Sequence, residues 1–379
     1  MKIVNLSLCM PYNDKWGYQE NLLPKWQHKI GNEVTLITTR FLNRQRDDKY
    51  DIANKETFIS DDGVKVIRLD WKLNIWPCRI LRIYKDLYKT LENEKPDFIF
   101  IHGCQFLDSF IVCKYLKNNK NVRAVVDNHA DPTNSAKSFF PTLLHKTLWK
   151  MAANNLNKYV DKFYGVLPIR CDFLHSYYKI PLNKIELLPM GLDDDLLTDL
   201  DKNVEESKRK YNINNSYTNI VCGGKFDHYK TEVLNLIEAV NKIPSLKLYI
   251  FGSIGDEIKQ QFNNLLLDRI IYVGWLSQKD SYALIKSCDI ACFPGRHSVI
   301  WEQTVALGVP LIVRKWPGTT EHININNNCL FLEKGSTDEI TSTLQPLLSN
   351  SYIDALKKKA NIEKRLIFSY KNIAEKSII

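Results

Sequence analysis

Short apolar runs rich in valine, isoleucine and phenylalanine alternate with helix-period segments almost from one end of the chain to the other. Glycine, proline or aspartate bounds the runs, a pattern typical of parallel strands buried on both faces. Such alternation predicts doubly wound α/β sheets, and two successive sets predict two Rossmann-like domains facing across a cleft. The expected strands are Lys2–Ser7, Glu33–Thr39, Val64–Leu69, Phe98–His102, Ala124–Asn128, Lys162–Val166 and Ile185–Leu188, then Asn219–Cys222, Lys247–Phe251, Ile270–Val273, Ile290–Phe293, Pro310–Val313 and Cys329–Leu332.

The domain boundary is expected near Gly191–Val204, where Pro189-Met190-Gly191 closes the first set and the acidic, loop-like segment Leu192–Asn203 follows. We therefore predict an N-terminal domain over residues 1–195 and a C-terminal domain over residues 196–365. Residues 366–379 are expected to form a C-terminal helix that packs back toward the N-terminal domain. Ligands of open α/β sheets lie outside the carboxyl ends of the strands, so the cleft is the expected site.

Composition narrows the class of protein. Of 379 residues, 44% are hydrophobic and 25% charged, as in ordinary globular proteins, which excludes a disordered or fibrous chain. No apolar run has the length of a membrane span, and the N-terminus lacks a signal-peptide pattern. Nine cysteines show no metal-ligand spacing. We interpret them as free thiols of a cytoplasmic protein without structural zinc.

The formal net charge of +9 lies entirely in the first half of the chain. Residues 1–190 hold 29 Lys+Arg and 20 Asp+Glu, whereas the remaining residues hold 23 of each. This asymmetry favours an anionic partner such as a phosphorylated substrate or phospholipid, although a solvated basic face gives the same count. No signature of a nucleic-acid-binding module is present, so no nucleic acid is expected.

Two segments of the first half carry basic residues beside apolar and aromatic ones at helical spacing: Trp76–Lys89 and Lys137–Lys150. Such helices suit peripheral contact with the inner leaflet of a membrane. Amphipathic helices that face a protein core have the same pattern, so both interpretations stay open.

The segment 289–313 carries the most chemical information. A predicted strand ends at Phe293, and Ser298 is a suitable N-cap for a helix Val299–Leu307. The unpaired N–H groups at such a helix start suit a phosphate. Glu302 lies about one turn into the helix, where it could meet a ribose diol. A carboxylate at this place is also simply stabilising for a helix.

Further candidates follow other predicted strands. Gly223-Gly224 would let the backbone approach a ligand, and Lys225 with Lys230 could clamp a diphosphate, although solvated lysines are the ordinary interpretation. His129 directly follows an expected strand of the first half and is expected in the cleft, although a capping or core histidine is the alternative interpretation. His102 has the same position with fewer polar neighbours. Gly17 lies in the loop after the first strand, where a glycine can lie against substrate.

Together these segments resemble the retaining GT-B glycosyltransferases of family four, which use nucleotide-sugar donors. The segment GGKFDHYK resembles the family's motif "G-R-x-x-x-x-K". The segment KIELLPMGLDDDLL resembles the stretch that leads into the family's interdomain hinge, and WEQTVALGVPLIV resembles its last motif. All three occur along the chain in the family's order. The family usually shows Glu-x7-Glu, and Glu302 matches the second glutamate. Pro294 occupies the position of the first glutamate, so Arg296, His297 or Ser298 would make the contacts with the donor sugar that this glutamate usually makes. Similar loops occur in a subgroup that assembles polysaccharide and lipopolysaccharide.

The resemblance implies roles for particular residues. His129 would meet the donor sugar across the cleft, and Lys225 and Lys230 would hold the diphosphate. Ser298 and Val299 would meet the phosphates, and Glu302 the ribose. The loop Trp275–Ser277, through Trp275 and Leu276, would bracket the base, with uridine expected and guanosine or adenosine as alternatives.

The implied reaction is a retaining hexosyl transfer to a glycan or lipid-diphosphate-linked acceptor, in surface polysaccharide synthesis, without cofactor or metal ion. A nucleotide-sugar epimerase of the same fold is an alternative. A second alternative is a non-catalytic partner of an active transferase. The presence of Pro294 in place of the first glutamate favours this alternative, whereas the presence of Lys225, Lys230 and Glu302 argues against it.

Overall fold

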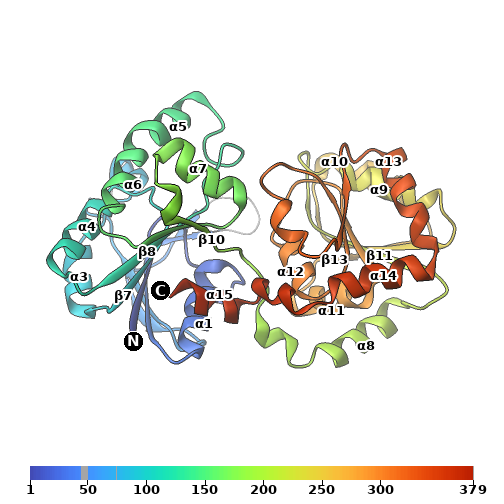
Figure 1. Ribbon diagram of the computed structural model, residues 1–379, viewed down its shortest axis with the longest axis horizontal. Coiled ribbons are helices and arrows are strands. Elements are labelled where there is room, and N and C mark those ends of the chain that lie inside the picture. Colours follow the sequence, from blue (N-terminus) through green and yellow to red (C-terminus); the bar gives the residue numbers. More distant parts are fainter. Residues whose placement is uncertain (44–49, 74, 379) are drawn as a thin grey trace. The chain divides into compact units, whose positions relative to one another are not determined.

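The computed structural model describes residues 1–43, 50–73 and 75–378, and the chain divides into two compact units (Figure 1). Unit 1 comprises Met1–Pro189 and Tyr370–Ile379, and unit 2 comprises Met190–Ser369. The division falls at 189/190 where we expected 195/196. Leu192 belongs to the core of unit 2, and the Asp193 N–H donates to the Tyr282 hydroxyl of the same unit.

Unit 1 is built on a sheet with the order β10-β9-β8-β7-β1-β2-β6-β5, in which only the edge strand β5 runs antiparallel among the strands described. A separate antiparallel pair, β3 and β4, was not expected from the sequence. The strands are β1 (Lys2–Ser7), β2 (Glu33–Thr39), β3 (Phe41–Asn43), β4 (Tyr50–Ile52), β5 (Thr57–Ile59), β6 (Lys65–Leu69), β7 (Phe98–His102), β8 (Arg123–Asn128), β9 (Lys162–Gly165) and β10 (Ile185–Leu187).

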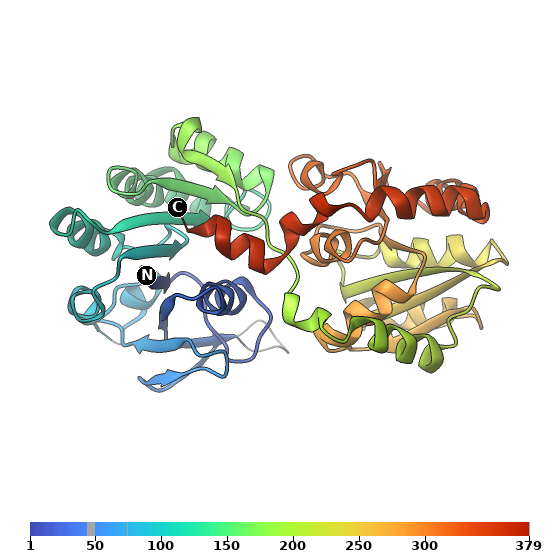
Figure 2. The same cartoon turned by 60° about the horizontal axis from the view of Figure 1, so that its bottom comes forward.

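Helices cover both faces of this sheet (Figures 1 and 2). One apolar cluster joins α1 and α15 to one face, and a second joins α3, α4, α6 and α7 to the other. Gln27 of α1 donates from Nε2 to Ser377 Oγ of α15 at 2.9 Å. The helices are α1 (Gln19–Lys29), α2 (Trp76–Ile80), α3 (Leu87–Glu94), α4 (Ser109–Asn118), α5 (Phe139–Leu144), α6 (Lys150–Leu156), α7 (Pro168–Tyr178) and α15 (Tyr370–Ser377).

Unit 2 has a parallel sheet in the order β13-β12-β11-β14-β15-β16 around one apolar core. Its strands are β11 (Thr218–Phe226), β12 (Leu246–Ile254), β13 (Ile270–Gly274), β14 (Ile290–Phe293), β15 (Leu311–Arg314) and β16 (Cys329–Leu332). Its helices are α8 (Leu200–Tyr211), α9 (Glu232–Asn241), α10 (Asp256–Leu265), α11 (Gln278–Ser287), α12 (Ile300–Ala306), α13 (Thr337–Leu344) and α14 (Asn350–Ala360). The prediction of two α/β domains with parallel sheets is confirmed.

Each sheet has an interior position at which the strand order reverses. In unit 2 the reversal lies at β11, whose neighbours β12 and β14 continue the chain in opposite directions, and in unit 1 it lies at β1, between β7 and β2. Ligands of such sheets bind outside the carboxyl ends of the strands at this switch point. The segments that follow β11 and β14 are therefore the first place to look for a site in unit 2.

The segment Trp76–Lys89 does not form the single amphipathic helix that its spacing suggested. Arg82 and Asp86 take left-handed backbone conformations with φ of 57° and 62°, which separates α2 from α3. Between these breaks, Tyr84 is buried and donates its hydroxyl to the Leu8 carbonyl at 2.9 Å. This tyrosine is a core residue of unit 1 and not part of a surface face.

All nine cysteines are free, as predicted, and seven of them are buried. In the part of the chain that the structure describes, no helix combines the length and the apolar character needed to cross a membrane.

The glycines after Cys222 were expected in a loop, but β11 continues through Phe226. Gly224 and Gly252 face each other on paired strands, and a Cβ on Gly252 would lie 1.8 Å from the Gly224 carbonyl oxygen. A Cβ on Gly223 would meet the Phe251 ring at 2.2 Å. These glycines therefore allow the close approach of two strands, a packing role that the sequence did not separate from ligand binding.

We predict that Gly252→Ala destabilises unit 2 more than Gly274→Ala does. Both glycines have positive φ, 117° and 77°, but only Gly252 lacks room for a Cβ. Left-handed strain alone costs about 1–2 kcal/mol. The clash at Gly252 should lower the free energy of unfolding by about 1–3 kcal/mol more. Urea denaturation followed by circular dichroism measures both, and equal midpoints would contradict the packing role.

Candidate functional site

A small cavity of about 20 Å³, room for a single water molecule, lies at the switch point of unit 2. Residues of β11 and the segment after it, among them Gly223 and Lys230, line one side. Pro294, Arg296 and Ser298, which follow β14, line the other. The two segments that the sequence singled out thus meet at the carboxyl edge of one sheet.

Lys230 is the partly buried cation of this edge. Burial lowers the pKa of its ammonium group, while Asp227, Cys222 and Glu232 act to raise that pKa and the positive Arg296 acts to lower it. Its Nζ lies 3.9 Å from the place where a side chain on Gly224 would begin. Lys225 is exposed near the end of β11, and Arg296 is exposed after β14, so further cationic side chains emerge at the same edge of the sheet. A cluster of this kind suits an anionic ligand.

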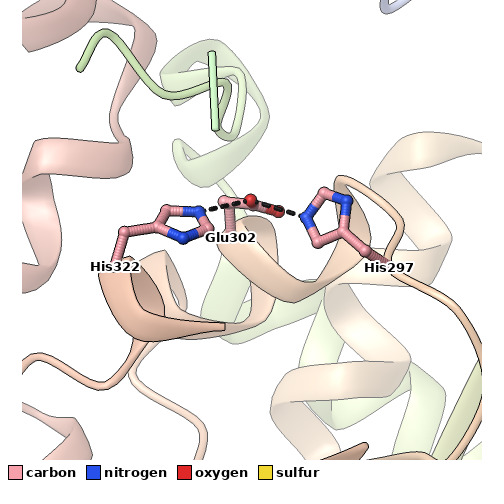
Figure 3. Close-up of side chains that lie close together, drawn as sticks. All are labelled: His297, Glu302 and His322. Carbon is pink, nitrogen blue, oxygen red and sulfur yellow. Dashed lines mark hydrogen bonds and ion pairs between the residues drawn. The ribbon is translucent and has the colours of Figure 1, made fainter. Parts of the chain in front are cut away.

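Glu302 on α12 is held by two histidines (Figure 3). His297, in the loop before α12, lies with Nε2 2.8 Å from Oε1, and His322, in the short helix Glu321–Ile323, lies with Nε2 2.7 Å from the same oxygen. A carboxylate only accepts, so each imidazole donates its Nε2–H. The Glu302 side chain has 0% of its surface exposed.

The two histidines decide the charge of this carboxyl group. Burial acts to raise the pKa of Glu302, but the charges and hydrogen bonds of His297 and His322 outweigh it and hold the pKa at about 2. The carboxylate is therefore ionised at neutral pH. Its second oxygen, Oε2, is buried and has no hydrogen-bond partner among the residues described. A buried acceptor without a donor is uncommon in folded proteins.

The same three side chains have the donor set of a metal site. Their ligand atoms lie within 4.8 Å of one another, and across the described ranges no other group of histidine, cysteine, aspartate or glutamate side chains meets this criterion. His322 was not found from the sequence, although it follows β15 at the same edge as the other candidates. The expectation that no metal is needed stays a prediction.

Ser298 is not the N-cap of α12. The helix begins at Ile300, the capping position is Val299 with helical backbone angles, and no side chain caps it. The Ser298 carbonyl instead accepts the Trp301 N–H at 2.9 Å, which closes a tight turn before the helix. The Ser298 side chain is thus not committed to the helix, and it lines the cavity.

The loop after β13 holds the residues expected at a base. Trp275 is 71% exposed. Leu276 packs partly against the core of unit 2. Ser277 caps α11, because its hydroxyl accepts the Asp280 N–H at 3.1 Å. Trp275 is therefore the side chain of this loop that is open to a ligand.

His129 lies in unit 1, directly after β8, with 20% of its side-chain surface exposed. Its Nε2 lies 3.1 Å from Oδ2 of Asp127, a carboxylate that the sequence analysis missed. The spacing of two residues at a strand end is the signal that could have found it. Gly17 is exposed in the loop between β1 and α1. Each of these residues belongs to unit 1, whereas Lys225, Lys230, Trp275, Leu276, Ser298, Val299 and Glu302 belong to unit 2.

We predict that Glu302→Gln makes the free energy of unfolding less sensitive to acid. The pKa of Glu302 is lowered in the folded state, so its stabilising contribution is present above about pH 4.5 and is lost as the pH falls toward 2. The free energy of unfolding of the wild type should fall by about 3 kcal/mol more than that of the variant between pH 5 and pH 2. Urea titrations at several pH values measure the difference, and parallel curves would contradict the ionised Glu302.

Two family models match consecutive parts of the chain. The model described as Glycosyltransferase Family 4 matches residues 23–196, and the model described as Glycosyl transferases group 1 matches residues 203–366. An uncharacterized 41.2 kDa protein in the cps region of Klebsiella pneumoniae is 23% identical over 255 residues. That match covers 63% of this chain and 65% of the relative.

Solved structures share the fold over the whole chain. The HepE protein (Alr3699) of Anabaena in complex with UDP has a TM-score of 0.70 at 13% identity, with 99% of this chain and 98% of that chain covered. WaaG, a glycosyltransferase involved in lipopolysaccharide biosynthesis, has a TM-score of 0.64 at 13% identity, with 100% of both chains covered. With matching family models over both halves and this shared fold, the chain belongs to the GT-B glycosyltransferases of the family 4 type.

Proposed function

We propose that this protein transfers a hexosyl group from a nucleotide-sugar donor, a UDP-sugar, with retention at the anomeric carbon and without a metal ion. The acceptor would be a glycan or a lipid-diphosphate-linked oligosaccharide of surface polysaccharide synthesis. The observation that carries the proposal is the switch point of unit 2, where Lys230 and the buried, ionised Glu302 both follow strands at one edge. HepE has been solved with UDP, which supports the choice of base.

In this proposal each part of the donor has a chemical counterpart in unit 2. Lys225 and Lys230 neutralise the diphosphate, and Ser298 with Val299 contacts its oxygens. Oε2 of Glu302 accepts a ribose hydroxyl, because Oε1 is already bonded to both histidines. The exposed Trp275, beside Leu276, stacks on the base.

The chemical step follows from where charge develops. The bond from the anomeric carbon to the phosphate oxygen breaks, and the departing nucleoside diphosphate gains negative charge. Lys225 and Lys230 stabilise that charge electrostatically, the work that a divalent cation does in other phosphate sites. The leaving phosphate can itself take the proton of the acceptor hydroxyl. We assign His129 and Gly17 of unit 1 to the transferred sugar.

Pro294 supports a second candidate, a non-catalytic partner of an active transferase. Proline at this position offers no carboxylate to the donor sugar, and its neighbour Arg296 is exposed over the Tyr229 ring at 5.1 Å. In the proposed enzyme, the cationic side chain of Arg296 contacts the donor sugar in place of the missing carboxylate. Turnover of a UDP-sugar separates the two candidates.

A membrane surface is the proposed location of the acceptor. On α5, Phe139 is 83% exposed and Phe140 is 67% exposed, and α5 buries none of its residues. Lys137 comes two residues before Phe139 in the chain and Lys146 comes six residues after Phe140, and both lysines are exposed on unit 1. Exposed aromatic residues between lysines favour binding to an anionic lipid interface. We propose peripheral contact through α5, at the inner face of a cytoplasmic membrane.

The donor site predicts a specific pattern of ligand-induced stabilisation. UDP at about 100 times its dissociation constant should add about 2.7 kcal/mol to the stability of the wild type. Lys230→Ala should lose most of this response, because the charge opposite the diphosphate is gone. Lys242→Ala is the matched control, since Lys242 is an exposed lysine of unit 2 paired with Asp338 at 3.1 Å. Thermal unfolding with and without UDP measures all three proteins.

Transfer is tested in the same preparation by mass spectrometry of an oligosaccharide acceptor mixture with UDP-sugars. We expect the acceptor to gain the mass of a hexose, also when a chelator is present. By NMR, the anomeric configuration of the product should match that of the donor. Loss of transfer on metal removal would overturn metal independence and make His297, Glu302 and His322 a metal site. UDP binding without turnover of any donor would favour the non-catalytic partner.

The membrane contact has its own test. A Phe139→Ser, Phe140→Ser double variant should bind vesicles of phosphatidylglycerol and phosphatidylcholine at least about tenfold more weakly than the wild type, since burying one such ring is worth about 1.5–3 kcal/mol. Leu267→Ser removes an apolar side chain that is 55% exposed on unit 2 and serves as the control. Sedimentation with vesicles measures binding. Equal binding of the double variant, or equal binding to pure phosphatidylcholine, would contradict the proposal.

A further inference from the structure

Asp127 is a fully buried carboxylate at the carboxyl end of β8. The parallel register of β7 and β8 sets His102 opposite Asp127, and His129 follows two residues later. Burial acts to raise the pKa of Asp127, but the charges of His129 and His102 outweigh it and keep the pKa well below its usual range. The carboxylate is thus ionised inside unit 1, with histidines as its counterparts.

Both oxygens of Asp127 accept hydrogen bonds. Oδ1 accepts the Gly103 backbone N–H at 2.9 Å. Oδ2 accepts the Gln19 side-chain amide at 3.0 Å and faces His129 Nε2 at 3.1 Å. His102 Nδ1 lies 3.3 Å from the same oxygen without the alignment of a hydrogen bond. Groups from β7, β8 and the start of α1 therefore fix the position of this carboxylate.

Such a fixed acceptor decides where His129 carries its proton. A carboxylate cannot donate, so the ring nitrogen that faces it must bear hydrogen. In the neutral ring the proton then lies on Nε2, and Nδ1 carries a lone pair. No hydrogen bond to Nδ1 of His129 is recorded within the described part of the chain, and the side chain is one-fifth exposed. Nδ1 is thus left for an external donor.

We propose that Asp127 is a positioning residue that holds His129 in the Nε2-protonated tautomer, so that Nδ1 accepts a hydrogen bond from a hydroxyl of the transferred sugar. The ligand in this inference rests on the proposed function, whereas the tautomer does not. Gln19 has a place in the same arrangement, because its amide nitrogen bonds to Asp127 while its Oε1 is buried without a partner among the residues described. That oxygen is a second acceptor for a sugar hydroxyl.

The tautomer is measured directly by nitrogen-15 NMR of the full chain labelled at histidine, recorded at alkaline pH where the rings are neutral. In the wild type, His129 should show a protonated Nε2 and an unprotonated Nδ1, and a protonated Nδ1 would overturn the inference without any variant. Asp127→Asn should shift the proton toward Nδ1, because the amide can donate to Nε2. Asp131→Asn is the matched control: Asp131 is a buried carboxylate nearby that bonds to Arg170 at 3.0 Å, and its loss should leave the tautomer unchanged.

Kinetics separate positioning from structural support. Asp127→Asn should lower kcat by about 10-fold to 100-fold with little change in the KM for the donor. In a His129→Ala background the same substitution should cost nothing further, because Asp127 acts through the imidazole. A full additional loss in that background would overturn the positioning role. Thermal unfolding of each variant verifies that it is folded.

The two ideas fail in distinguishable ways. If the tautomer is as stated but no donor is bound or turned over, the proposed function is wrong and the pairing of Asp127 with His129 stands. If a donor is turned over while Asp127→Asn changes neither tautomer nor kcat, the positioning role is wrong and the proposed function stands.

Discussion

The parallel pairing of β11 with β12 and β14 is the constraint on which the site of unit 2 depends. Because these strands run in one direction, everything that follows them emerges at one edge, and the strand order reverses there. Lys230 after β11 and Glu302 after β14 are brought to this edge by topology alone. The glycine pair Gly224 and Gly252 keeps the two long strands close enough to maintain the register.

Both units place an ionised carboxylate in their interior and hold it with histidines. Asp127 faces His102 and His129, and Glu302 faces His297 and His322. The histidine rings face these carboxylates with nitrogen atoms that can carry hydrogen, so they orient each carboxylate and lower its pKa. A metal ion would compete for the same nitrogen atoms in unit 2. In our account these histidines orient acceptors for hydroxyl groups, which are what a sugar offers.

Much of this arrangement follows from local patterns in the sequence. Buried strands such as Ile290–Phe293 are bounded by residues that end strands, so their limits agree with the structure. The candidates Lys230, Ser298 and Glu302 were found because they follow such strands. His322 was missed because the fold brings it to Glu302 from a separate segment. Asp127 was missed although it lies two residues before His129 in the same segment. Tyr84 lies in a segment whose helical spacing fitted both a membrane-facing surface and a helix that faces the core, and the structure buries it in the core of unit 1.

The central claim is that Oε2 of Glu302 accepts a ribose hydroxyl of the donor. Calorimetric titration of the full chain with UDP and with its 2′-deoxy and 3′-deoxy analogues tests it most directly. Our account predicts that one analogue binds about 10-fold to 100-fold more weakly, because it leaves the buried oxygen without a donor. In Glu302→Gln that discrimination should shrink. Equal affinity of the wild type for UDP and both analogues would contradict the account.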